Sequence, residues 1–180
     1  MTKLIDDLTK WLQTEVCDKV ELKKASQKGD ISYEYELVHP TAFPCFCPPQ
    51  DKTNLPITPS VTVQIDNATD DLTNESAVNI ALIFSVWNTG THDNRDKEKR
   101  VFDKNYDGWR DLWHFIDKAR LAIRKNFNVA GYEVKGEINS RPLSGDNAIM
   151  GTYPYFFGEV TFTVGTIESP TGNVDIRNML

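Results

Sequence analysis

The chain has 180 residues, of which 39% are hydrophobic and 26% charged, and it carries a formal net charge of -6. This length and composition suit a single domain, 1–180, with a packed core, and they exclude a chain that is disordered throughout. The acidic balance, with a sequence pI of about 5.1, argues against a protein dedicated to wrapping nucleic acid.

The N-terminus and the apolar stretches indicate where the protein is found. The first residues, MTKLIDDLTKWLQTEV, alternate apolar and acidic side chains, which is typical of neither a signal peptide nor a transit peptide. The longest apolar stretch, Val78–Trp87, is far too short to span a bilayer. We therefore expect a soluble protein that is made in the cytosol and does not bind membranes.

The first third of the chain predicts a helix, two strands and a proline-rich loop. Thr2 is placed to cap the helix, and Val20–Lys24 and Tyr33–Val38 resemble strands on either side of a turn. The segment 39–59 holds six of the nine prolines, and because proline removes ladder donors we expect an extended loop or a sheet edge there. The apolar residues that recur at helical spacing in the first segment are Leu4, Ile5, Leu8, Trp11, Leu12 and Val16.

The middle of the chain has clear strand character. In Ser60–Ile65 valine and isoleucine alternate with polar residues, which indicates one buried face. Val78–Trp87 is apolar on both faces toward its middle, as in a central strand. The intervening DNATDDLTNES has turn composition, so we expect these two strands to form a hairpin.

A charged run, THDNRDKEKRVFDKN, is expected to be a loop, and it leads into a second helix over Asp107–Phe127. Asp107 is placed to act as the N-cap, because its carboxylate can accept hydrogen bonds from amides of the first turn. We interpret Trp109 and Trp113 as core residues, the alternative being an exposed platform for a ligand. They belong to an apolar stripe of Trp109, Leu112, Trp113, Ile116, Ala119, Ile123 and Phe127.

The last third predicts a strand in GYEVKGEIN, a loop in RPLSGDNAIMGTYP and a strand over Tyr155–Val164, followed by a loose tail from about residue 169. Strands before and after one central helix favour an α+β fold. We predict a mostly antiparallel sheet with an N-terminal helix and one central amphipathic helix packed on it.

Two groups of residues have metal-ligand chemistry. Cys45 and Cys47 form a single C-x-C with no second ligand pair beside it, so we expect small buried side chains rather than a zinc site. His92, Asp93 and Asp96 lie in a densely mixed charged run, which is usually a solvated surface. They nevertheless define an alternative function, a small metal-dependent hydrolase.

Other catalytic patterns are missing from the sequence. It contains no G-x-S-x-G elbow and no glycine-rich phosphate loop, and its three histidines stand in unrelated contexts. We therefore expect a protein that is not an enzyme and binds no cofactor or metal.

The order of these elements resembles that of phage tail terminators and head–tail joining (tail completion) proteins, in particular those of Firmicutes prophages. The matching pieces are LIDDLTKWLQTEV, PSVTVQIDNATDD, AVNIALIFSVWNTGTHD, YDGWRDLWHFIDKARLAIRKNF and YPYFFGEVTFTV. They cover most of the chain as a pattern rather than an invariant motif. The proline-rich segment with CFC and the RPLSGDN loop have no counterpart in that pattern.

The resemblance implies a virion structural protein without catalytic activity. Such proteins form rings, often hexameric, that end tail-tube growth or join the tail to the capsid connector. Their partners are copies of themselves and other virion proteins of the neck or tail tube, and DNA would at most pass through the ring lumen. They assemble in the host cytoplasm and stay in the virion neck or tail. The leading candidates for a subunit or partner contact here are Arg95, Asp96, Lys97, Glu98, Lys99 and Arg100.

Overall fold

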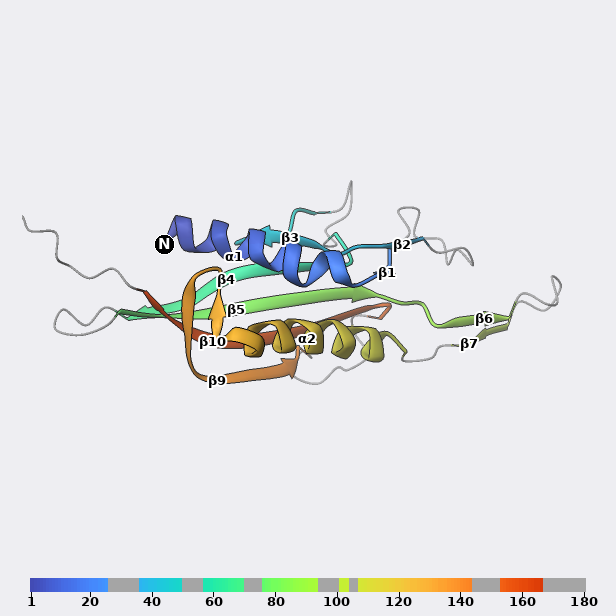
Figure 1. Ribbon diagram of the computed structural model, residues 1–180. Helices are drawn as coiled ribbons and strands as arrows, with labels where there is room; N and C mark the ends of the chain where they lie inside the picture. Colours follow the sequence, from blue (N-terminus) through green and yellow to red (C-terminus); the bar gives the residue numbers. More distant parts are fainter. Residues whose placement is uncertain are drawn as a thin grey trace, which may run out of the picture.

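A computed structural model describes residues 1–25, 36–49, 57–69, 76–93, 101–103, 107–143 and 153–166. In this part of the chain, an N-terminal helix and a central helix pack on a largely antiparallel, curled sheet (Figure 1). The α+β class predicted from the sequence is therefore confirmed. The tail expected from about residue 169 lies outside the described residues.

Both predicted helices are present, with ends that differ by a residue or two from the prediction. Helix α1 spans Thr2–Glu15 and is followed by a short 3-10 turn, η1 (Cys17–Lys19), and helix α2 spans Asp107–Asn126. The proposed cap at Thr2 is wrong, because the helix already includes Thr2 and the capping position is Met1, which makes no side-chain cap bond. Packing on the sheet, rather than a cap, must supply most of the stability of this short helix.

The main sheet has six strands in the order β3-β4-β5-β10-β9-β8. Neighbouring strands run antiparallel throughout, except that β3 is parallel to β4. The strands are β3 (Thr41–Pro44), β4 (Ser60–Thr69), β5 (Ser76–Trp87), β8 (Asn128–Val129), β9 (Tyr132–Pro142) and β10 (Tyr155–Thr166). A separate pair, β1 (Leu22–Lys23) and β2 (Leu37–Val38), lies within the two early segments predicted as strands.

The predicted hairpin of the two central strands is confirmed. Strands β4 and β5 pair antiparallel, with Val61 opposite Phe84 and Val63 opposite Leu82. These four side chains are at most 1% exposed, so the alternation read from the sequence identifies the buried face of the sheet. On its other side β5 pairs with β10 along its whole length, which makes it a central strand.

The proline-rich segment was expected to form an extended loop or a sheet edge, and it contributes the edge strand β3. An edge strand leaves some backbone amides without a ladder partner. Here the amide of Ala42 donates to the Gln13 side chain of α1 at 2.9 Å, and the Gln13 amide nitrogen donates to the carbonyl of Pro40 at 3.3 Å. The helix therefore satisfies the backbone of the strand on which it packs.

The core lies between one face of the sheet and the two helices. Helix α1 covers β3 and β4, and α2 covers β5 and β10. The rings of Phe84 and Phe115 meet edge to face with centroids 4.9 Å apart. The largest fully buried side chains are Phe84, Phe115, Leu8, Leu12, Ile80, Leu82, Leu112, Ile116, Ile123, Val16, Val61 and Val63.

The close packing of α2 on the sheet depends on one glycine. A Cβ atom added at Gly158 of β10 would lie 2.7 Å from Cδ1 of Ile116 and 3.3 Å from Cδ2 of Leu112. A side chain at this position would have to displace these two methyl groups, so the glycine allows α2 to pack close to β10.

The opposite face of the sheet carries polar side chains. Ser60 and Ser85 share a buried hydroxyl hydrogen bond of 2.7 Å across β4 and β5, and Thr163 donates to Asn79 at 2.7 Å across β10 and β5. This face thus combines cross-strand hydrogen bonds between small polar groups with a small apolar cluster in which Ala25, Trp87 and Tyr155 are buried.

Candidate functional site

The charged run after β5 is not a simple loop, because its two ends pair as a ribbon. Strand β6 (Thr91–Asp93) runs antiparallel to β7 (Val101–Asp103), with His92 opposite Phe102. The ribbon extends past the end of the main sheet, away from both helices (Figure 1). The prediction of a loop is wrong at the two ends of this run. The apolar pair Val101 and Phe102 is too short to predict a strand among so many charged residues.

The six predicted contact residues, Arg95, Asp96, Lys97, Glu98, Lys99 and Arg100, lie outside the described residues. By sequence they connect the two strands of the ribbon. The structure therefore describes the residues that hold the two ends of this segment, and the geometry of the candidate site is the geometry of those residues.

The base of the ribbon is held by Asn88, a 2%-exposed residue directly after β5. Its side-chain oxygen accepts from the Lys23 ammonium at 3.1 Å and from the amide of Gly90 at 2.8 Å. Its side-chain nitrogen donates to the Asp111 carboxylate of α2 at 2.7 Å. One asparagine thus links β1, the start of the ribbon and the central helix.

Backbone contacts complete this anchor. The amide of Asn88 donates to the carbonyl of Pro154 at 3.0 Å, and the Tyr153 hydroxyl donates to the carbonyl of Thr89 at 2.6 Å. Gly90 has a φ of +92°, a left-handed conformation that favours glycine where the chain turns into β6. The direction in which the ribbon leaves the body is therefore fixed by the body itself.

The helix that follows the ribbon begins at Asp107. The prediction placed this residue one position earlier, as the N-cap that precedes the helix. Its carboxylate lies 3.2 Å from the Arg110 guanidinium, and an acidic side chain in the first turn is favourable to the helix dipole. Gly108 lets the first turn approach the ring of Phe156 closely. The ribbon therefore leads into a tightly packed helix start.

The two tryptophans of this helix have different surroundings. The indole of Trp109 is partly buried and meets the Phe156 ring edge to face, with centroids 5.4 Å apart. Trp113 is 36% exposed and Phe127 is 69% exposed, so the prediction that these two residues belong to the core stripe is wrong, whereas Trp109 packs against the core. The buried stripe instead includes Phe115, because this residue completes the three- and four-residue steps that start at Leu112.

The residues with metal-ligand chemistry are only partly brought together. His92 and Asp93 are consecutive positions of β6, and Asp96 lies outside the described residues. Among the residues that the structure describes, no group of three or more His, Cys, Asp or Glu side chains could hold a metal ion. His39 places Nδ1 2.9 Å from the carbonyl of Val20 and serves a structural hydrogen bond.

Cys45 and Cys47 are not the small buried side chains that were expected. Cys45 has a φ of +59°, and both Cys45 and Cys47 are half-buried rather than buried. The thiol of Cys47 lies 3.5 Å from the hydroxyl of Ser60 on the polar sheet face. Cys17, in contrast, is fully buried under α1, and burial raises the pKa of its thiol to about 12.

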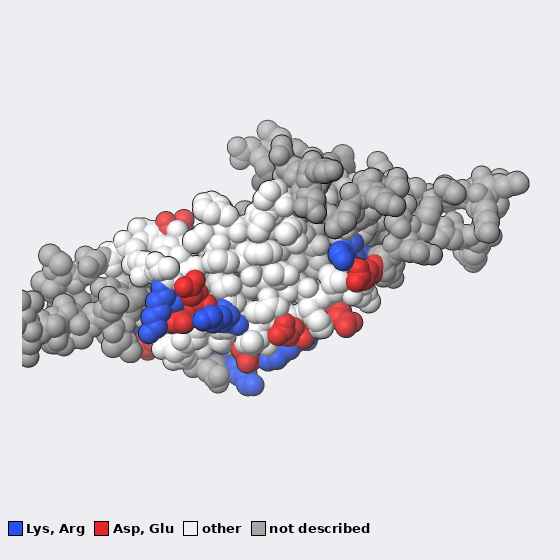
Figure 2. All heavy atoms as spheres, turned by 90° about the horizontal axis from the view of Figure 1, so that it is seen from above, with Lys and Arg blue, Asp and Glu red and all other residues white. Residues whose placement is uncertain are grey.

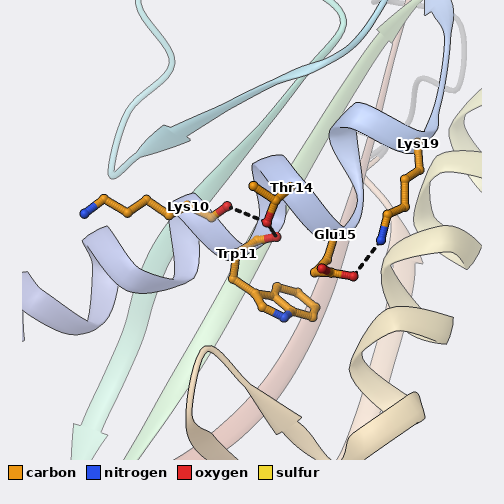
Figure 3. Close-up of polar contacts among 5 residues, drawn as sticks. All are labelled: Lys10, Trp11, Thr14, Glu15 and Lys19. Carbon is orange, nitrogen blue, oxygen red and sulfur yellow. Dashed lines mark hydrogen bonds and ion pairs between the residues drawn. The ribbon is translucent and has the colours of Figure 1, made fainter.

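The exposed side of α1 carries a local ion pair that faces the end of α2. Lys19 donates to the Glu15 carboxylate at 2.6 Å, while Thr14 hydrogen-bonds to the carbonyls of Lys10 and Trp11 (Figure 3). The hydrogen bond and charge of Lys19, followed by the charge of Lys125, lower the pKa of Glu15 below its ordinary value. Lys125 of α2 therefore lies within electrostatic reach of α1.

On the face seen in Figure 2, charged side chains form small groups, and the centre of the face is uncharged.

Comparison of the chain with models of known protein families and with curated proteins found no match. In the described part of the chain, neither helix is both long enough and apolar enough to cross a membrane.

The residue that sequence reasoning missed is Asn88, with its partner Asp111. The only sequence signal for Asn88 is that a polar residue ends an apolar strand immediately before a glycine-containing turn. The partner from α2 is 23 residues away, and only the packing of the helix across the sheet brings the two together.

Proposed function

We propose that this protein is a non-enzymatic structural protein of a phage or prophage virion, which forms a ring as a tail terminator or head–tail adaptor. The observation that carries the proposal is the anchored β6–β7 ribbon, which extends past the body and bears the charged segment 94–100. Copies of the chain would meet through this segment, and other virion proteins of the neck or tail tube would bind the assembled ring.

A two-stranded ribbon is marginal in water by itself and gains stability when another surface covers it. Its base is nevertheless fixed by Asn88, whose buried side chain is hydrogen-bonded to Lys23, Gly90 and Asp111. An anchored, projecting ribbon can supply one of the two different surfaces that a head-to-tail contact between neighbouring copies joins.

The arrangement of the other elements is consistent with this role. The order of helix, hairpin, charged segment, helix and late strand is the order that the resemblance to tail terminators implies. In this proposal the central helix is an amphipathic element whose apolar side holds the sheet and whose solvent side is free for contacts between subunits.

The test is the assembly state of the full chain with and without the charged segment. Light scattering after size exclusion, with negative-stain electron microscopy, should show rings or defined oligomers of the wild type. Replacing Arg95, Lys97, Lys99 and Arg100 with serine should weaken assembly while the thermal unfolding of the monomer stays unchanged. The matched control replaces three lysines of α1 and η1 with serine, Lys3, Lys10 and Lys19, and should assemble normally.

Two results would contradict the proposal. One is a wild-type chain that stays monomeric at the highest soluble concentration, both with and without magnesium. The other is stabilisation by a divalent metal that His92→Ala removes, because this would support the alternative hydrolase with His92, Asp93 and Asp96 as ligands.

A further inference from the structure

One edge of strand β9 is uncovered over much of its length. Strand β8 pairs only with Tyr132 and Glu133, and the amide of Val134 donates to the carbonyl of Phe127 at 2.9 Å. Among the described strands, residues 137–141 have no pairing partner on this side, and Figure 1 shows β9 along the margin of the sheet. We call residues 137–141 the free edge of β9.

The register of β9 shows which backbone groups point to the free side. The amide of Leu143, directly after β9, donates to the carbonyl of Phe157 of β10 at 2.9 Å. Because the direction alternates along an antiparallel strand, every second residue before Leu143, back to Asn139, points its amide and carbonyl toward β10 as well. The amide and carbonyl of Ser140 and the carbonyl of Ile138 therefore point away from the sheet, where an added strand would bind.

The free edge of β9 is bounded on both sides by residues that end a ladder. Gly136, with a φ of +72°, lies where the register against β10 shifts between Lys135 and Asn139. Pro142 has no amide, and the alternation places its missing donor on the free side. A strand that binds here can therefore pair only with residues 137–141.

The sequence of the free edge, EINSR, is complementary to itself when it is read in the opposite direction. In an antiparallel pair centred on Asn139, Glu137 lies opposite Arg141 of a second copy, at a Cβ separation of about 4.5–5.5 Å. A parallel pair would instead place equal charges opposite each other. Both side chains are exposed, and although the Arg141 Nε donates to Glu159 at 2.6 Å, a guanidinium has further N–H donors. The charge pattern therefore favours a second copy of this chain as the partner.

The opposite edge of the sheet is closed to such a partner. The amides of Thr41 and Cys45 donate to β4 or to the residue before it, so the positions between them in β3 alternate in direction. Of the outward positions, Ala42 already donates its amide to the Gln13 side chain at 2.9 Å, and Pro44 has no amide. Pairing of β9 with β3 of a neighbour is thus disfavoured, and pairing of β9 with β9 remains.

We propose that two copies of this chain join their sheets through the free edges of β9, antiparallel and centred on Asn139. The amide of Ser140 of each copy then donates to the carbonyl of Ile138 of the other, and Glu137 of each copy faces Arg141 of the other. The contact is isologous, so it closes a dimer and does not build a ring by itself. It uses a different surface from the β6–β7 ribbon and does not depend on the ring proposed above. Because the contact is short, the dimer should dissociate on dilution.

The test exchanges the charges of the contact. Variant A carries Glu137→Arg and variant B carries Arg141→Glu. Each alone should dimerise at least about tenfold more weakly than the wild type in sedimentation velocity, because like charges then face each other on both sides of the axis. An equimolar mixture should dimerise again, because the two basic residues of variant A meet the two acidic residues of variant B. The control, Glu133→Arg in the part of β9 that β8 covers, should dimerise like the wild type.

Hydrogen exchange tests the ladder itself. At a concentration at which the wild type is dimeric, the amide of Ser140 should exchange at least about tenfold more slowly than in variant A. The amide of Asn139 points toward β10 and should exchange alike in both chains, so it serves as the internal reference. Circular dichroism shows that each variant is folded.

All these chains carry the serine substitutions of the charged segment described above, so that a ring through the ribbon does not contribute. The contact is wrong if this background stays monomeric at its highest soluble concentration, if neither charge variant weakens the dimer, or if the mixture does not recover it. A dimer with the expected charge dependence, found together with a wild-type chain that forms no ring, would support this contact and refute the ring.

Discussion

The sharpest prediction concerns Asn88, since one buried side chain connects the ribbon to the body. Replacing Asn88 with alanine removes hydrogen bonds of 3.1, 2.7 and 2.8 Å to Lys23, Asp111 and the amide of Gly90. The Gly90 bond is buried, and an amide left without a partner costs about 1–3 kcal/mol. The bonds to Lys23 and Asp111 are partly buried, so water replaces part of their contribution.

Together these effects predict that Asn88→Ala lowers the free energy of unfolding by about 2–4 kcal/mol. For a chain of this length the loss corresponds to a fall of about 5–15 °C in the melting temperature. Urea unfolding followed by tryptophan fluorescence measures the free energy directly. The matched control is Asn139→Ala, an exposed asparagine of β9, which should change the free energy by less than about 0.5 kcal/mol.

A second substitution at the same position tests the geometry of the anchor. Asn88→Asp keeps the acceptor for Gly90 but places a carboxylate against the carboxylate of Asp111, so it should be at least as destabilising as alanine at neutral pH. Adding Asp111→Asn restores a donor and should recover most of the loss. An Asn88→Ala variant as stable as the wild type, or an additive double variant, would refute the anchor as described.

Three further predictions follow from the core and the helix surface. Gly158→Val should lower the free energy of unfolding by more than about 2 kcal/mol in urea unfolding, because its side chain would displace Ile116. A thiol reagent should modify two cysteines of the native protein and reach Cys17 only on unfolding, because its thiol is buried with a raised pKa. In an NMR titration, Lys19→Ala should raise the pKa of Glu15 toward its ordinary value. Because the pKa of Glu15 is lowered in the native protein, the ion pair stabilises the fold above the unfolded-state pKa. This stabilisation is lost as the pH falls through the native pKa. Equal labelling of all three thiols, or an unchanged Glu15 titration, would contradict the last two.

The parts of the fold that the sequence predicts are those with a long, regular apolar period. The alternation in Val61 and Val63 and the apolar run of β5 identify the central hairpin, because a strand must present every second residue to the core. The strands β3, β6 and β7 are three or four residues long, and segments so short contain at most two periods of a strand pattern. Their pairing is decided by partners that are distant in sequence.

The error at Trp113 has a similar origin. Successive helix positions are about 100° apart, so Trp113, one residue after the buried Leu112, falls at the margin of the apolar side. A large apolar side chain at such a margin extends the stripe in the sequence without being covered in the fold. Trp109 is held by Phe156, a contact that depends on where β10 lies and that no local pattern reveals.

The central helix therefore has two structural roles: it packs on the sheet, and it holds the base of the ribbon. Leu112 and Ile116 define how closely the helix lies on β10, and Asp111 connects the helix to the base of the ribbon through Asn88. A shift of α2 against the sheet would also move the base of the ribbon, because the hydrogen bond between Asn88 and Asp111 joins the two. Asn88→Ala should therefore loosen the base of the ribbon and leave the packing of Leu112 and Ile116 on β10 in place.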